Sequence, residues 1–384
     1  MSRVNASIPV LRWAFQRAGL SDEEVEKRFK FWPQWLKGEV QPTLKQLEGF
    51  ARLTRTSFGY FFLAEPPRLE LPVPDFRTVR DEILAEPSTN LLDTIYLCQQ
   101  RQDWYRQHAR MQGMEALTFV GSANQRQLPH DVANEMRSVL GLPIGQRLLA
   151  SNWQDALRQM IAGAEQAGIM VMVNSMVGSY QKRKLDVGEF RGFALSDSLA
   201  PLVFINGADS KSAQMFTLAH ELAHLWLDAT GVSNAGVADP AEKRTERWCN
   251  QVAAEFLVPM AALREQHRSG APAAEEMQRL SRVFKVSTLV ALRRLHDAGF
   301  IDQKALWRHY HEEEQRLKTL KQKKTSNGGS YYNTLGVRVG RRFARAIISS
   351  ALEGTTSFTE AHRLLGVKAA STFNRAAKEF GVLT

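Results

Sequence analysis

The segment with the clearest chemical signature is FTLAHELAHLWLD, residues 216–228. His220 and His224 are four residues apart, so on a helix both imidazoles lie on one face and can reach a single metal ion, with Glu221 beside them. In such an H-E-x-x-H pattern the histidines are typical zinc ligands, and the glutamate can act on a zinc-bound water. The alternative is a helix with two buried histidines, but three leucines of the segment already provide an apolar face.

A hydrolytic zinc site also needs a third protein ligand and an open position for water. Downstream, EKRTERWCNQVAAEFLVP (residues 242–259) is predicted to form a helix that offers Glu242, Glu246 and Glu255. Spacing alone does not choose among the three. Nine helical steps separate the last two and turn one about 180° from the other, so those two cannot both face one metal ion.

Together the two segments resemble the ImmA/IrrE family of metallopeptidases, in which an H-E-x-x-H helix is followed by a Glu-x-x-Cys/Ala-Asn helix that runs into Leu-x-Pro. The resemblance covers about residues 190–295. It implies that His220, His224 and Glu246 bind the metal ion and that Glu221 is catalytic.

The same resemblance predicts a mechanism and some supporting residues. Zn²⁺ lowers the pKa of its bound water from 15.7 toward about 7 and polarises the scissile carbonyl, while Glu221 takes the water proton and delivers it to the leaving amine. Asp228 and Asn250 are candidates to orient the ligands. Glu255 is expected to be a bystander.

The apolar segment PLVFIN (residues 201–206) directly precedes the H-E-x-x-H helix. We interpret it as an edge strand along which a peptide substrate could add, through Phe204, Ile205 and Asn206. An ordinary core strand is the alternative interpretation.

These residues must be positioned by an α+β fold that is mostly helical. Residues 168–178 and 192–207 are short, apolar and bounded by Gly and Asn, which is typical of strands in a small sheet. Helical periodicity dominates elsewhere. We predict five regions along the chain. They are a helix-turn-helix domain (residues 1–66), a helical connector (67–130), a zinc metallopeptidase domain (131–300), a charged helix with a linker (301–330) and a basic helical module (331–384).

The N-terminal segment 35–63 resembles the second half of a repressor-type helix-turn-helix domain. Its shared features are a Gly, a Pro-Thr helix start and spaced Leu and Ala residues, at Gly38, Pro42, Thr43, Leu44, Leu47 and Ala51. The expected recognition helix, however, contains Trp32, Pro33 and Trp35 where polar base-reading side chains are usual. The domain could therefore bind DNA or serve for packing and protein contact.

Net charge is concentrated at the C-terminal end of the chain. The whole sequence has 50 Lys+Arg and 40 Asp+Glu, and residues 316–384 contain 13 and 3 of these, which leaves 37 of each sign for residues 1–315. Arg338, Arg341, Arg342 and Arg345 are candidate nucleic-acid contacts. The alternative is that these basic residues only form a solvent-exposed face of a helix, and the sequence supports this interpretation equally well.

Composition excludes several classes of protein. The 384 residues are 44% hydrophobic and 23% charged, close to globular averages, and only two cysteines are present. No stretch is long and apolar enough to span a membrane, so we expect a cytoplasmic protein.

The function predicted from the sequence is a zinc-dependent endopeptidase that acts on a regulatory protein partner, such as a repressor or toxin, in transcriptional or stress regulation. The alternative is an antitoxin-like DNA-binding regulator whose zinc site is structural or vestigial.

Overall fold

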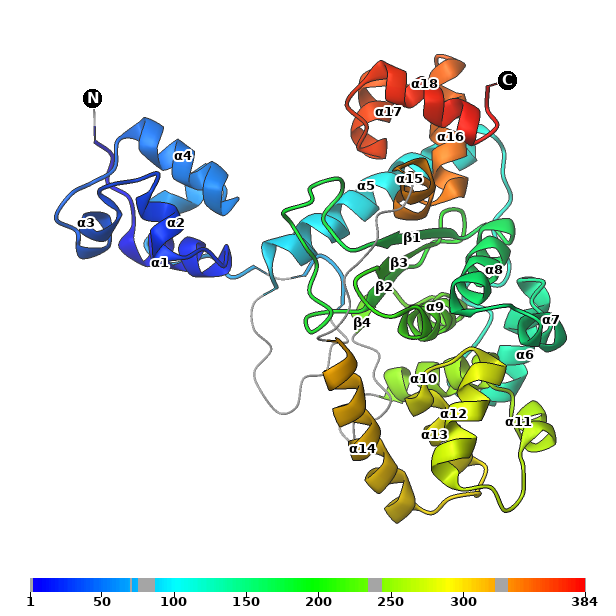
Figure 1. Cartoon of the computed structure of the whole chain (residues 1–384). Helices are drawn as coiled ribbons and strands as arrows, with labels where there is room; N and C mark the ends of the chain where they lie inside the picture. Colours follow the sequence, from blue (N-terminus) through cyan, green and yellow to red (C-terminus); the bar gives the residue numbers. More distant parts are fainter. Residues whose placement is uncertain (1–2, 70, 75–86, 234–243, 322–330, 384) are drawn as a thin grey trace. The chain divides into compact units, whose positions relative to one another are not determined.

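The computed structural model describes every residue except 1–2, 70, 75–86, 234–243, 322–330 and 384 (Figure 1). Its described part is mostly helical with one four-stranded sheet, which confirms the predicted α+β class. The chain forms two compact units, Met1–Pro72 with Leu84–Asp93, and Val73–Ile83 with Thr94–Thr384.

The first unit is a small helical domain with an aromatic core. It contains α1 (Ile8–Arg17), α2 (Asp22–Glu26), α3 (Trp32–Lys37), α4 (Leu44–Thr54) and the 3-10 helix η1 (Phe58–Phe62). Trp32 and Trp35 are at most 1% exposed and pack with Phe50. The residues that replace base-reading side chains in α3 are therefore core residues of this unit.

Capping boxes begin two of these helices. Ser21 pairs with Glu24 at the start of α2, and Thr43 pairs with Gln46 at the start of α4. The second helix is short: α2 ends at Glu26, and the chain then turns so that the ring of Phe29 packs into the aromatic core.

The second unit is built on a sheet of β1 (Met170–Asn174), β2 (Gly192–Leu195), β3 (Leu202–Asn206) and β4 (Gly231–Ser233), in the order β1-β3-β2-β4. β1 and β3 are parallel, and the other neighbours are antiparallel. Because β3 has a partner strand on each side, the prediction that residues 201–206 form an edge strand is wrong.

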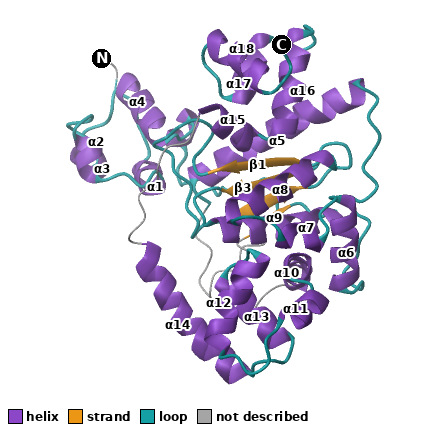
Figure 2. Cartoon of the chain, turned by 45° about the vertical axis from the view of Figure 1, so that its right-hand side comes forward, coloured by secondary structure: helices purple, strands orange, loops and turns teal. Residues whose placement is uncertain are grey.

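Both faces of the sheet are covered, which explains why its strands read as continuous apolar runs. Val171, Val203 and Ile205 point into a core shared with α8 (Trp153–Gln166) and α9 (Lys211–Trp226). Their neighbours along the strands face the opposite side. There α5 (Thr89–Met111) and the C-terminal helices lie across the sheet (Figures 1 and 2).

The remaining helices of this unit pack around α9 and beyond it. They are α6 (Pro129–Val139), α7 (Ile144–Leu148), α10 (Arg244–Leu257), α11 (Met260–Gln266), α12 (Ala273–Phe284), α13 (Thr288–Asp297) and α14 (Gln303–Lys321). α10 lies directly against α9 and α6.

Four helices make up the C-terminal module: α15 (Tyr331–Val339), α16 (Arg341–Leu352), α17 (Phe358–Leu365) and α18 (Ala370–Glu379). α15 and α16 contact β1. Gly340, between them, has φ 80°, and an added Cβ there would lie 3.0 Å from the carbonyl oxygen of Val171. A glycine is therefore needed where the module meets the sheet. No helix within the described residues is long and apolar enough to cross a membrane.

Candidate metal centre

The H-E-x-x-H segment lies in α9, a helix that is buried on nearly every side. Ser210 caps its first turn by accepting a hydrogen bond from the backbone N–H of Ala213. His220, Glu221 and His224 are each at most 1% exposed. Titratable groups are rarely buried so completely unless they are paired or bind a metal ion.

Glu246 on α10 meets both histidines of α9. One carboxylate oxygen lies 3.1 Å from Nε2 of His220, and the other lies 3.0 Å from Nε2 of His224. The two Nε2 atoms are themselves 3.1 Å apart. All three side chains thus direct their ligand atoms toward one point, within 4.8 Å of one another.

This donor set fits a zinc ion. Two imidazoles and one carboxylate, with further space for water, are the ligands of catalytic zinc sites in hydrolases. Burial opposes ionisation of Glu246, but His220 and the hydrogen bonds from both imidazoles hold its pKa well below the usual range. The carboxylate is therefore in the charged form that a metal ion requires.

Asn250 fixes the orientation of one ligand. Its Oδ1 lies 2.9 Å from Nδ1 of His220, so this nitrogen must donate the hydrogen bond and Nε2 keeps its lone pair for a metal ion. Asn250 lies one helical turn after Glu246 and so supports the site from the same helix. The structure thus places Asn250 where the sequence predicted a supporting residue.

Asp228 has a different place from the predicted one. α9 ends at Trp226, and the chain turns through Asp228 with φ 52°. Its carboxylate accepts a hydrogen bond of 2.6 Å from the hydroxyl of Ser196 instead of contacting a histidine. The helix stops two residues before Asp228, which leaves this carboxylate in the turn beside Ser196, and its predicted role of orienting a ligand histidine is therefore not supported.

Glu221 is held by a residue that sequence reasoning missed. Ser233, on β4, donates a hydrogen bond to Oε1 of Glu221. The second oxygen, Oε2, is buried and has no hydrogen-bond partner among the described residues. An orphaned carboxylate oxygen beside three metal-ligand atoms is suited to receive a water.

Gly192 also belongs to this environment. A Cβ at this position would lie 3.0 Å from Oε1 of Glu221 and 2.5 Å from Cγ2 of Thr217. Burial raises the pKa of Glu221 to about 8, and the positive charge of a metal ion at the neighbouring ligands would lower it again, toward the ionised form that can accept a proton. Neither Ser233 nor Gly192 has a sequence signal, because pairing of β2 with β4 brings them together from distant parts of the chain.

Glu255, the last glutamate of the second predicted helix, does not join the site. Glu255 pairs with Arg294 and accepts a hydrogen bond of 2.9 Å from the backbone N–H of Met260. Glu242 lies outside the described residues.

The predicted substrate strand is in the interior of the sheet. Phe204 stacks on Phe193 with ring centroids 4.9 Å apart, Ile205 belongs to the core, and Asn206 bonds the carbonyl of Phe190. The backbone of these residues is already paired with β1 on one side and β2 on the other.

The edge strand beside the site is β4. The backbone N–H of Val232 donates a hydrogen bond of 3.0 Å to the carbonyl of Pro74. This edge therefore already carries a segment of the same chain.

The four candidate nucleic-acid arginines do not form one exposed cluster. Arg338 is only 7% exposed. Arg342 donates to the hydroxyl of Tyr105 at 2.8 Å and to the backbone carbonyl of Glu165 at 3.1 Å. Arg341 and Arg345 are exposed. Half of the predicted set is therefore used for packing within the unit.

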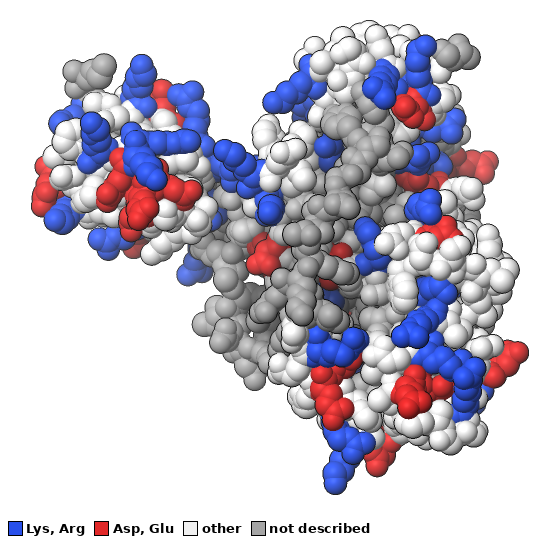
Figure 3. All heavy atoms as spheres, in the orientation of Figure 1, with Lys and Arg blue, Asp and Glu red and all other residues white. Residues whose placement is uncertain are grey.

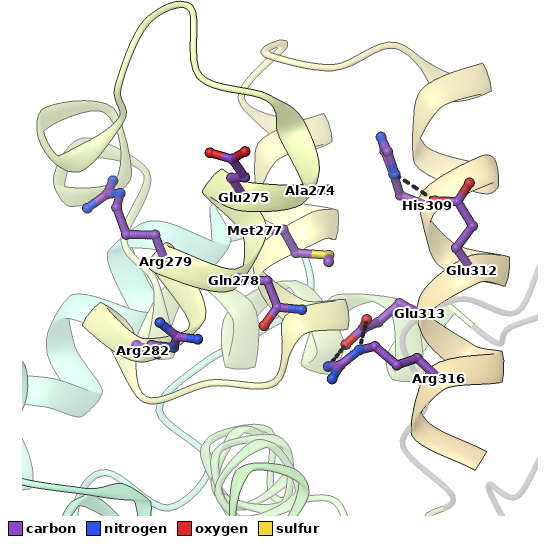
Figure 4. A pocket seen from close by; sticks show the side chains of 10 residues that line it. All are labelled: Ala274, Glu275, Met277, Gln278, Arg279, Arg282, His309, Glu312, Glu313 and Arg316. Atoms are coloured by element: carbon purple, nitrogen blue, oxygen red, sulfur yellow. Dashed lines mark hydrogen bonds and ion pairs between the residues drawn. The ribbon is translucent and has the colours of Figure 1, made fainter. Parts of the chain in front are cut away.

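One hollow of this unit, of about 620 Å³, is lined by Leu227 and Ala229 after α9 and by Thr245 at the start of α10, and no residue of the candidate metal site lines it. Another of about 570 Å³ lies between α12 and α14 (Figure 4). Some of its charged side chains pair with one another, as Arg316 does with Glu313 and His309 does with Glu312, and no residue of the candidate metal site lines it.

Comparison with known families agrees with this geometry. Residues 164–296 match the IrrE N-terminal-like domain. This is a peptidase family, and the matched region contains the H-E-x-x-H helix, Glu246 and the whole sheet. Residues 339–379 match a domain of unknown function. None of the curated proteins matches the chain. The first match suggests a metallopeptidase of the ImmA/IrrE type.

Proposed function

We propose that this protein is a zinc-dependent endopeptidase that cleaves a regulatory protein, such as a repressor or toxin. The observation that carries the proposal is the convergence of His220, His224 and Glu246 beside a buried glutamate that is not itself a ligand. The match to a peptidase family over this region supports it.

The residues of the chain divide the chemistry among them. A Zn²⁺ ion held by the two histidines and Glu246 would supply a Lewis acid and an activated water. Glu221 is placed to accept the water proton on Oε2 and to pass it to the leaving amine, while Ser233 holds the other oxygen. Asn250 keeps His220 in the tautomer that leaves Nε2 available.

A peptide substrate would have to bind in extended form near β4. Arg126 and Arg244 line the hollow beyond the end of α9, and a part of the substrate that reached this hollow would meet positive charge, which favours acidic side chains. Backbone pairing along β4 would require the contact between Val232 and Pro74 to open.

The alternative function is a regulator with a structural or vestigial zinc site. A structural site needs closed coordination by four protein ligands and gives no role to a buried carboxylate such as Glu221. Burying that carboxylate is costly, so its presence favours the peptidase.

The test compares the wild-type protein with Glu221→Gln. Both should bind about one zinc ion per chain, because the ligand set is intact. Incubated with a proteome from the source cells, only the wild type should generate new protein N-termini, and cleavage should fall at least about 100-fold in the variant. Glu265→Gln, an exposed change on α11, is the matched control. Identical N-termini from Glu221→Gln, or a wild type that binds no zinc, would contradict the proposal.

A further inference from the structure

The C-terminal module contains two helices joined by a tight turn. α17 ends at Leu365, and α18 begins at Ala370 after the four residues 366–369. Gly366 has φ 69°, and Val367 follows with its N–H bonded to the carbonyl of His362. A turn of three or four residues that contains a glycine is typical of the helix-turn-helix motif.

The two helices are packed as a rigid pair. Phe373 of α18 contacts Phe358 and His362 of α17, with ring centroids 5.5 Å and 5.3 Å apart. Val367 in the turn is buried. The orientation of α18 is therefore fixed by α17.

α18 has two distinct faces. Its buried stripe consists of Phe373, Ala376, Ala377 and Phe380. The exposed stripe consists of Ser371, Asn374, Arg375 and Lys378, with the same helical spacing. We call this second set the α18 stripe.

The α18 stripe has the chemistry of a base-reading surface. An Asn amide can make two hydrogen bonds to adenine, an Arg guanidinium can do the same with guanine, and Ser and Lys can bond bases or phosphates. Lys368 is exposed in the turn just before the helix. The acidic residue of α18, Glu379, lies at its C-terminal end, away from the N-terminal residues that contact bases in such motifs.

The charge of the module suits a polyanion. Residues 331–384 contain eight Lys+Arg and three Glu, a net charge of +5. On the visible surface of α16–α18, basic side chains are more prominent than acidic ones (Figure 3). The basic side chains of the α18 stripe are exposed, whereas Arg338 and Arg342 are used inside the fold.

In the N-terminal unit, the expected recognition helix α3 has no such exposed polar stripe. Both tryptophans of α3 belong to the core. Lys37, at the C-terminal end of the helix, is exposed, and the remaining side chains of α3 are half-buried. Burial thus removes the residues that would have to enter a groove.

We propose that α17 and α18 form a DNA-binding helix-turn-helix, and that the α18 stripe enters the major groove of duplex DNA. This inference does not depend on the peptidase activity. It gives a role to the region that matches a domain of unknown function.

The experiment measures binding of the full-length protein to a mixed-sequence 30-bp duplex by fluorescence anisotropy, over a range of salt concentrations. The variant Arg375→Ala/Lys378→Ala should bind at least about tenfold more weakly, and the slope of log affinity against log salt should fall by about 2. The control Arg264→Ala/Lys304→Ala removes the same charge from exposed positions on α11 and α14 and should bind as the wild type does.

A second variant tests base reading. Selection from random duplexes should yield a preferred sequence with the wild type, and Asn374→Ala should lose the preference at one base position with little change in salt dependence. The proposal is overturned if the wild type fails to bind duplex DNA at about 50 mM salt, because even non-specific binding to DNA is detectable at such a low salt concentration. It is also overturned if both double variants lose affinity equally, or if single-stranded RNA binds better than duplex DNA.

Discussion

Two glutamates of α10 show how one helix can separate a metal ligand from a structural residue. Glu246 and Glu255 lie nine residues apart, which places them on opposite faces of the helix, about 180° from each other. The first faces α9 and its histidines, while the second meets Arg294, which is also bonded to the carbonyl of Val258. Each carboxylate is thus compensated by a different partner.

Substitution of these two residues should have opposite consequences. Glu246→Ala should weaken zinc binding at least about 100-fold, because three protein ligands become two. Glu255→Ala should leave zinc affinity unchanged but lower the free energy of unfolding by about 1–3 kcal/mol, because the buried Arg294 then keeps only Asp297, at 3.7 Å, and the carbonyl of Val258 as partners. Competition with a chromophoric chelator and denaturant unfolding measure the two effects. A Glu246→Ala protein that holds zinc as tightly as the wild type would refute the ligand assignment.

The sequence predicted the residues of the candidate metal site that lie on regular helices, and it missed those that the sheet contributes. The helical spacing of His220 and His224 is a local property, whereas Ser233 reaches Glu221 only because β4 pairs with β2. The position of β3 inside the sheet could not be predicted either, since β4 has three residues and no strand signal of its own. Local patterns predict elements, and pairing between distant segments decides their order.

At the scale of elements, α12 is tied to the loop before it by one buried carboxylate. Glu276 is 2% exposed and accepts hydrogen bonds from Arg279 at 2.6 and 2.9 Å and from the N–H of Arg268 at 3.0 Å. The imidazole of His267 lies 3.4 Å away. The hydrogen bonds from Arg279 lower the pKa of Glu276 to about 2, against a burial effect in the opposite direction.

This carboxylate should make stability depend on acid pH. Because the pKa is lower in the folded state than its ordinary value of 4.5, the stabilisation is complete above about pH 4.5 and is lost as the pH falls toward 2. Glu276→Gln should therefore lower the free energy of unfolding at pH 6 by about 1–3 kcal/mol and make little difference near pH 2. Urea unfolding at a series of pH values measures this. Glu275→Gln, its exposed neighbour, is the matched control and should leave the pH profile unchanged.

At the scale of the molecule, the C-terminal module is part of the second unit and not an appended arm. Trp104 of α5 donates to the hydroxyl of Thr356 at 3.1 Å, and Arg101 donates to the carbonyl of Leu364 at 3.0 Å. Arg342 reaches back to α5 and α8. The sequence predicted a separate basic module because these partners are more than 170 residues apart, and composition carries no information about such contacts.

Ending the chain at residue 321 should therefore damage the fold of the second unit, because it exposes the aromatic face of the sheet that α15 and α16 help to cover. We expect retained far-UV circular dichroism, weakened near-UV signals and increased binding of a hydrophobic dye, the signs of lost side-chain packing. The matched control begins the chain at residue 73, which removes residues 1–72 of the first unit together with its whole aromatic core, and it should keep the thermal unfolding transition of the second unit. A chain ending at residue 321 that unfolds at the same temperature as the intact protein would show that the module is dispensable for the sheet. If the shortened chain stays folded, a loss of DNA binding can be attributed to the missing module. If its fold is damaged, only point variants of the α18 stripe can show that the module binds DNA.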